Sequence, residues 1–218
     1  MVSIFECWKD YQLGERIHAL DRPVFDDLKN QHGLNLHCLP LPFYGPLKTA
    51  PIVFLYLNPG LSELDLKQAK SIEEQKRRCE SLKGLTPLSQ LRRNSKKSWW
   101  VDKAAFLEMP IEDLTDKIAV LQLCAYRSKE FKDWPLIAAL PTSRVAISWA
   151  QEELFADAQA GKRVVICLRS PRYWGLASGE SYGEALFAPL TTRNGHIQKS
   201  GAMRDTIRQA VKRILDGG

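Results

Sequence analysis

The sequence has little of what would place this chain in a membrane or outside the cell. No apolar run approaches the roughly 20 residues needed to cross a bilayer, and the first residues lack a basic region followed by an apolar one. Its cysteines are odd in number and widely scattered, which argues against a disulfide framework. They are Cys7, Cys38, Cys79, Cys124 and Cys167. We therefore expect reduced core thiols, no membrane contact and a cytoplasmic location.

Metal and cofactor motifs are also missing from the sequence. His18, His32 and His37 lie in the N-terminal third without the spacing of metal ligands. His196 follows Asn194-Gly195, a turn signal, and is the one histidine considered as a remote candidate for proton transfer. We expect no metal and no cofactor, with the histidines at the surface or in the core.

A chain of 218 residues that is 44% hydrophobic can bury one full core, so we expect a single domain over 1–218. The formal net charge is +6, and many of the basic residues lie between positions 67 and 103. This cluster favours a polyanionic partner such as DNA; the alternative is a solvated helix face followed by a loop. Its members are Lys67, Lys70, Lys76, Arg77, Arg78, Lys83, Arg92, Arg93, Lys96, Lys97 and Lys103, opposed by Glu73, Glu74, Glu80 and Asp102.

Four apolar runs have the length of buried strands: 52–57, 118–124, 164–168 and 186–190. Helical segments are expected between them, one from position 142 to 160 and a last one capped by Ser200. Alternating strands and helices predict a three-layer α/β/α domain with a central four-stranded, mainly parallel sheet. In such folds ligands bind beyond the carboxyl ends of the strands, so the residues after each run are the candidates for a site.

The first of these strand ends is a sharp turn, Asn58-Pro59-Gly60. Proline fixes one dihedral angle, glycine permits positive φ, and Ser62 with Asp65 predicts a capping box for the next helix. The side chain of Asn58 could hold a water molecule or a polar ligand, and the backbone N–H groups of residues 60–62 could face an anion. The alternative is an ordinary strand-to-helix corner.

The other two strand ends are cationic and aromatic. Arg127 follows the second run, and Arg169 and Arg172 follow the third; arginines there could bind phosphate through two nitrogens. Aromatic side chains beside them could stack on a base, although such residues are more often packed in the core or at its rim. They are Tyr126, Tyr173 and Trp174.

The segment 51–62, with Leu57-Asn58-Pro59-Gly60 at its centre, resembles the first motif of the uracil-DNA glycosylase superfamily, in its mismatch-specific and single-strand-selective branches. Arg169-Ser170-Pro171-Arg172 resembles the second motif, at a similar separation. The resemblance implies a glycosylase-like fold and hydrolysis of the N-glycosidic bond of a damaged or deaminated base in DNA. It implies that Asn58 positions the attacking water and that Arg169 and Ser170 contact the departing base.

By the same resemblance, Pro59, Gly60 and Pro171 would shape the base pocket, and Tyr173-Trp174 would act as a wedge during base flipping. Tyr56 stands where the family motif begins with glycine, and Arg169 where it has histidine or asparagine. Phe43 or Tyr44, or else Trp99-Trp100, would supply the aromatic platform. Because of Tyr56 and Arg169, a nucleic-acid or nucleotide binding protein without hydrolysis is a second reading of the sequence. A third is an α/β enzyme for a small phosphorylated ligand, which Arg127, Arg169 and Arg172 would bind.

All of these readings depend on one spatial expectation. Asn58 and Arg169 follow different strands, so both must lie at the same rim of the sheet and face one cavity. The candidate carboxylates for water activation, Asp102 and Asp133, have no feature in the sequence that singles them out.

Overall fold

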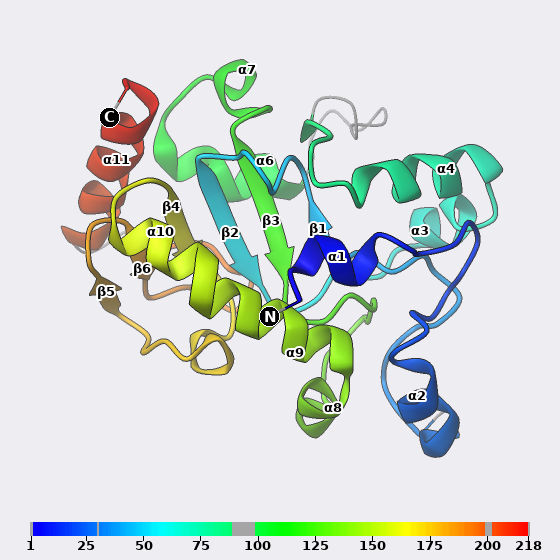
Figure 1. The fold of residues 1–218 in the computed structure, drawn as a ribbon. Helices are drawn as coiled ribbons and strands as arrows, with labels where there is room; N and C mark the ends of the chain where they lie inside the picture. The colour runs from blue at the N-terminus through cyan, green and yellow to red at the C-terminus, as the bar shows by residue number, and fades with distance from the viewer. Residues whose placement is uncertain (1, 30, 89–98, 199–201, 218) are drawn as a thin grey trace.

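The computed structural model describes residues 2–29, 31–88, 99–198 and 202–217. Its centre is a six-stranded mixed sheet in the order β1-β3-β2-β4-β6-β5, with helices on both faces (Figure 1). The strands are β1 (Phe43–Tyr44), β2 (Ile52–Tyr56), β3 (Ile118–Gln122), β4 (Val164–Cys167), β5 (Glu180–Tyr182) and β6 (Leu186–Ala188).

The α/β class agrees with the sequence analysis, whereas the number of strands does not. In chain order, the four apolar runs correspond to β2, β3, β4 and β6. In the sheet, β2 lies between β3 and β4, β6 lies next to β4, and all three pairs are parallel. Two further strands, β1 and β5, add to the edges in antiparallel orientation. Periodicity could not reveal either one, because β1 has two residues in a proline-rich stretch and β5 has three.

Helices lie before, between and after the strands, as the alternating pattern predicts. The segment from position 142 to 160 forms one nearly continuous rod of α9, a π-helical turn and α10, and it begins one residue earlier, at Pro141. The expected Ser200 cap of the last helix falls outside the described residues. The helices are α1 (Ile4–Trp8), α2 (Arg22–Leu28), α3 (Glu63–Gln68), α4 (Ile72–Ser81), α6 (Trp99–Ala104), α7 (Ile111–Leu114), α8 (Trp134–Ala139), α9 (Pro141–Trp149), α10 (Phe155–Gln159) and α11 (Ala202–Leu215), with short helices η1 (Ala105–Leu107), η2 (Ala150–Leu154) and η3 (Pro171–Trp174).

Alternate side chains of the inner strands face two different apolar layers. In β2, Val53 and Leu55 pack with α1, α9 and α10 on one face of the sheet. Ile52 and Phe54 pack with α6, α7 and α11 on the other face (Figure 1). A strand buried on both faces needs a continuous apolar run, which is why the central strands could be read from the sequence.

The thiols are free within the described residues, and four of the five are buried. Burial raises the pKa of Cys124 and of Cys167 to about 12, and that of Cys7 to about 11. At neutral pH these groups stay protonated and behave as small apolar side chains. Over the described ranges, none of the helices has both the length and the apolar character of a bilayer span.

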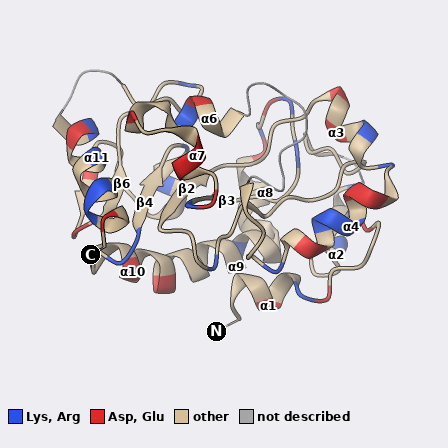
Figure 2. Cartoon of the chain, turned by 90° about the horizontal axis from the view of Figure 1, so that it is seen from above, with Lys and Arg blue, Asp and Glu red and all other residues tan. Residues whose placement is uncertain are grey.

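The basic segment between positions 67 and 103 is only partly described, because Arg92, Arg93, Lys96 and Lys97 fall outside the described residues. The part on α3 and α4 contains both acidic and basic residues along each helix (Figure 2). Arg77 pairs with Glu74 at 2.6 Å, and Lys83 pairs with Glu80 at 2.7 Å. Among the described residues, the segment is therefore a mixed charged surface with internal ion pairs.

Candidate functional site

A cavity of about 1040 Å³ opens at the carboxyl ends of β2, β3 and β4. Asn58 and Arg169 both line it, so the two strand ends meet at one rim of the sheet as expected. The volume suits a ligand of nucleotide size or larger. Its wall is formed by Leu41, Tyr44, Tyr56, Leu57, Asn58, Pro59, Gly60, Leu61, Ser62, Leu64, Asp65, Gln68, Glu74, Arg77, Arg78, Ser81, Trp99, Gln122, Arg127, Ser128, Lys129, Glu130, Phe131, Trp134, Arg169, Arg193 and Asn194.

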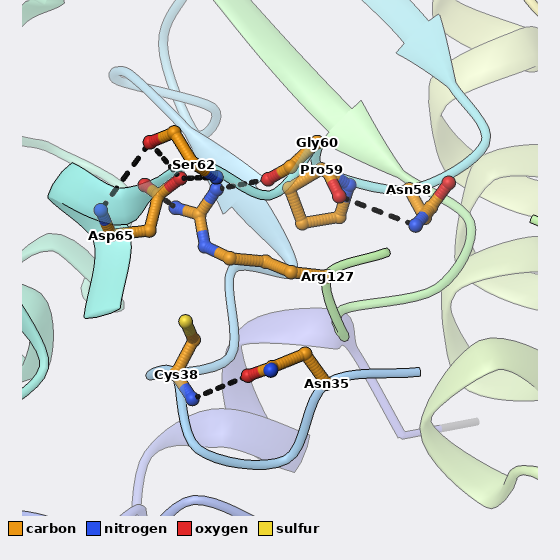
Figure 3. A network of polar contacts seen from close by, with 8 residues as sticks. All are labelled: Asn35, Cys38, Asn58, Pro59, Gly60, Ser62, Asp65 and Arg127. Atoms are coloured by element: carbon orange, nitrogen blue, oxygen red, sulfur yellow. Dashed lines mark hydrogen bonds and ion pairs between the residues drawn. The ribbon is translucent and has the colours of Figure 1, made fainter. Parts of the chain in front are cut away.

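The turn that carries Asn58 is fixed from two sides (Figure 3). Arg127 donates a hydrogen bond of 2.7 Å from Nη1 to the carbonyl oxygen of Gly60, and its Nη2 lies 3.1 Å from Oδ1 of Asp65. Oδ2 of Asp65 in turn accepts hydrogen bonds from the backbone N–H and the hydroxyl of Ser62. The backbone N–H of Asp65 donates to Oγ of Ser62, so the expected capping box is present. The Asp65 carboxylate thus takes the backbone N–H of Ser62 that could have faced a ligand anion.

The side-chain amide of Asn58 is oriented by its own donors. Nδ2 donates to the carbonyl oxygens of Pro59 and Tyr126, each at 3.2 Å, and to Oγ of Ser128 at 2.8 Å. Because carbonyl oxygens can only accept, the NH₂ group must face them, and this settles which amide atom is which. Oδ1 points the other way and accepts no hydrogen bond from the described residues (Figure 3). A rigid, free acceptor therefore lines the cavity.

Two further polar groups of the cavity wall are buried without partners. Tyr56 and Gln122 are paired in register at the ends of β2 and β3, so their side chains share one face of the sheet. The hydroxyl oxygen of Tyr56 and Oε1 of Gln122 are shielded from solvent, and neither has a hydrogen-bond partner in the described part of the chain. Burial also raises the pKa of Tyr56, which keeps its hydroxyl protonated at neutral pH. Unpartnered buried polar atoms are costly, and a polar ligand would satisfy them.

Arg169 closes the cavity together with the turn around Gly195. Its Nη1 donates to the carbonyl oxygen of Arg193, which holds the guanidinium beside that turn. Gly195 has φ +77°, and a Cβ there would lie 3.2 Å from the Tyr56 hydroxyl and 3.3 Å from Cδ of Arg169. Glycine at this position lets the turn approach both side chains. Trp99 adds an edge-on ring at 5.2 Å from the ring of Tyr56.

Three aromatic residues expected in the ligand site lie in the core instead. Trp174 is 0% exposed within η3, so it cannot act as a wedge in this conformation. Phe43 packs against Phe5 at a ring distance of 5.6 Å, in the layer below α1 and α9. The Tyr126 hydroxyl donates to Oδ2 of buried Asp21 at 2.6 Å. These corrections share one cause, because long-range packing, which strand ends do not reveal, buries each ring.

The second motif contributes less to the cavity than expected. Ser170 adopts a left-handed conformation with φ +56° at the start of η3, and it does not line the cavity. Pro171, Arg172 and Tyr173 also lie outside the lining set. Tyr173 stacks on Trp134 at 4.5 Å with an interplanar angle of 7°. Since Trp134 lines the cavity, Tyr173 supports its wall from behind.

Trp100, the partner of Trp99 in the expected platform, is fully buried, whereas Tyr44 and Trp99 line the cavity.

Sequence reasoning missed Gln122, Arg78 and Trp134 as lining residues. Gln122 is the one polar residue inside an otherwise apolar run, and that interruption is a signal that could have found it. Arg78 and Trp134 had no such mark.

The histidines and the two unassigned carboxylates stay away from the cavity. Nε2 of His18 lies 2.9 Å from the carbonyl oxygen of Cys7, in the core. His196 is exposed, with its Nε2 2.6 Å from Nζ of Lys103. Asp102 and Asp133 do not line the cavity. Within the described ranges, no group of three or more His, Cys, Asp or Glu side chains is placed to hold a metal ion.

Comparison of the chain with protein-family models, with curated proteins and with solved structures returned no match.

Proposed function

We propose that the cavity binds a nucleobase and that the chain is an N-glycosyl hydrolase for a damaged or deaminated base in DNA. The observation that supports this best is that two side-chain amides, those of Asn58 and Gln122, line the same cavity. Among the described residues, the rigidly held Oδ1 of Asn58 accepts no hydrogen bond, and the buried Oε1 of Gln122 has no partner. The motif resemblance around Asn58 agrees with this reading and does not establish it.

The chemistry of base removal suits these groups. Breaking an N-glycosidic bond develops positive charge on the sugar and negative charge on the departing base. Oδ1 of Asn58 would accept a hydrogen bond from the attacking water and direct its lone pair at the sugar carbon. A C–O bond forms as the C–N bond to the base breaks, and the proton that the water loses passes to the base anion, which leaves as the neutral base. The guanidinium of Arg169 would stabilise the anionic base by its positive charge and its N–H donors.

Gln122 would read the base itself. Its amide offers one acceptor and one donor in a plane, which is complementary to the neighbouring N–H and C=O of a keto base such as uracil or hypoxanthine. An amino base such as cytosine presents a different order of donors and acceptors. The cavity would therefore favour deaminated bases, with Tyr56 limiting how deeply they enter.

The test is incubation with oligonucleotides that carry uracil, hypoxanthine, xanthine or mismatched thymine. We expect abasic sites with at least one of these substrates, detected as alkali-sensitive strand breaks. Single-stranded and duplex forms of each oligonucleotide should be compared. Failure to release any base, from a protein that is folded by circular dichroism, would contradict the hydrolase.

Replacing Gln122 by leucine should lower kcat/KM for base release by about 100-fold, because two hydrogen bonds to the base are lost in a desolvated site. The melting temperature should stay the same or rise, since leucine removes a buried acceptor that has no partner. Single-turnover kinetics and a thermal melt measure the two effects. Equal kinetics for the variant and the wild type would remove Gln122 from base recognition.

A nucleic-acid or nucleotide binding protein without hydrolysis is the second candidate, and Arg169 is the observation that favours it. Arginine cannot exchange a proton with the base near neutral pH, and its Nη1 is already engaged by the Arg193 carbonyl oxygen. This candidate predicts oligonucleotide binding that weakens steeply with salt, without base release. Gel-shift titrations at several salt concentrations would show it.

A further inference from the structure

Arg78 places an unpaired guanidinium at the wall of the cavity. The residue lies on α4, and its Nε and Nη1 are both shielded from solvent without a hydrogen-bond partner among the residues that the structure describes. In the part of the chain that the structure describes, Arg78 forms no ion pair. Arg78 is partly buried, and shielded guanidinium nitrogens that form no ion pair are unusual, because desolvation disfavours the charged form.

The surroundings of Arg78 add a second positive charge. Burial and the neighbouring Arg127 lower the pKa of Arg78 to about 10, so the guanidinium remains cationic at neutral pH. Arg127 is itself mostly buried, and two of its nitrogens contact the Gly60 carbonyl and Asp65. Arg127 thus contributes charge, while Nε and Nη1 of Arg78 have no acceptor among the described residues.

The carboxylates near Arg78 already have cationic partners. Asp65 pairs with Arg127 at 3.1 Å and caps α3 through Ser62. Glu74 pairs with Arg77 at 2.6 Å. Both carboxylates line the same cavity as Arg78, yet neither forms a hydrogen bond or an ion pair with its guanidinium in the described residues. This part of the cavity therefore has an excess of positive charge and unused N–H donors.

We propose that Arg78 binds a phosphate group of the ligand that occupies the cavity, with Arg127 strengthening the local positive potential. A guanidinium matches a phosphate through two parallel N–H···O hydrogen bonds, which are stronger when both groups are charged. The inference rests on the proposed function in one respect, because that function supplies the nucleobase as the remaining part of the ligand. The phosphate would belong either to a free nucleotide or to a nucleic-acid backbone.

The first test compares thermal melts in inorganic phosphate and in chloride at equal ionic strength. Phosphate should raise the melting temperature of the wild type by about 3 °C over chloride. Arg78→Met should melt about 3 °C higher than the wild type in chloride, because an unpaired buried charge is gone. It should show no response to phosphate.

Lys76→Met is the matched control, since it removes a positive charge from the exposed face of the same helix. It should respond to phosphate as the wild type does. The proposal is overturned if phosphate stabilises the wild type no more than chloride does, or if Arg78→Met keeps the full response.

The second test separates the two sources of phosphate by calorimetric titration of a nucleoside, its 5′-monophosphate and a short single-stranded oligonucleotide. A monophosphate that binds about 30-fold more tightly than the nucleoside indicates a free nucleotide, provided that Arg78→Met removes the difference. An oligonucleotide that shows this dependence while the monophosphate does not indicates a backbone phosphate. No dependence on Arg78 with either ligand overturns the proposal.

These outcomes are distinguishable from the failure of the proposed function. Phosphate binding through Arg78 without base release would refute the hydrolase and leave the phosphate site intact. Base release that is unchanged in Arg78→Met, together with the absence of a phosphate effect, would refute the phosphate site and leave the hydrolase.

Discussion

Replacing Asn58 by alanine is expected to slow base release by about 1000-fold, which is the scale of losing a group that positions the nucleophile or stabilises the transition state. The physical reason is the way the amide is held. Three acceptors fix Nδ2, so Oδ1 has one orientation and can hold a water molecule in one place. Alanine preserves the cavity but removes the amide oxygen that would hold the water. Single-turnover rates on a substrate oligonucleotide measure the effect.

Ser128→Ala is the matched control for Asn58. It removes one of the three acceptors of Nδ2 and leaves the two carbonyl oxygens, so the amide should keep its orientation. We expect a loss of less than about 10-fold, the scale of one neutral hydrogen bond. If Asn58→Ala releases base at a rate close to that of Ser128→Ala, Asn58 does not position the nucleophile. If oligonucleotide binding is unchanged in Asn58→Ala, the loss of rate is a loss of chemistry.

The central part of the fold could be predicted because its signals are local. A strand covered on both faces must be apolar throughout, and the four inner strands have this property. The Ser62–Asp65 capping box needs two residues three positions apart and was also readable. Asn58 and Arg169 then followed from topology, because the carboxyl ends of neighbouring parallel strands meet at one rim.

The remainder of the site depends on contacts between residues far apart in the chain. Trp174 and Tyr126 follow strands as Arg169 and Arg127 do, yet they point into the core, where distant helices cover them. Arg78 lies on a helix with charges on several sides, and only the tertiary arrangement shows which of them faces the cavity. Sequence patterns place a residue on an element, whereas its exposure is decided by what packs against that element.

Tyr126 is an example of a residue whose burial depends on distant contacts. Its partner Asp21 is the residue whose replacement has the largest expected effect on stability. Asp21 is 0% exposed and accepts three hydrogen bonds. They come from the Tyr126 hydroxyl at 2.6 Å, the Thr142 hydroxyl at 2.6 Å and the Thr142 backbone N–H at 3.0 Å. The carboxylate therefore joins the start of α2, the segment after β3 and the first turn of α9. None of these contacts was visible from spacing, since the partners are over 100 positions away.

Replacing Asp21 by alanine should lower the free energy of unfolding by about 4 kcal/mol, because three buried donors lose their acceptor at once. Tyr126→Phe removes one donor to Asp21 and also the acceptor of the His18 backbone N–H, so it should cost about 2 kcal/mol, and it leaves both hydrogen bonds from Thr142 in place. Urea unfolding of the two variants and the wild type gives both values from one kind of measurement. If Asp21→Ala lowers the free energy of unfolding no more than Tyr126→Phe does, then water satisfies the donors that lost Asp21, and these hydrogen bonds are not part of a water-free core. A large loss from Asp21→Ala, together with unchanged base release from Tyr126→Phe, would establish that Tyr126 stabilises the fold and does not bind the base.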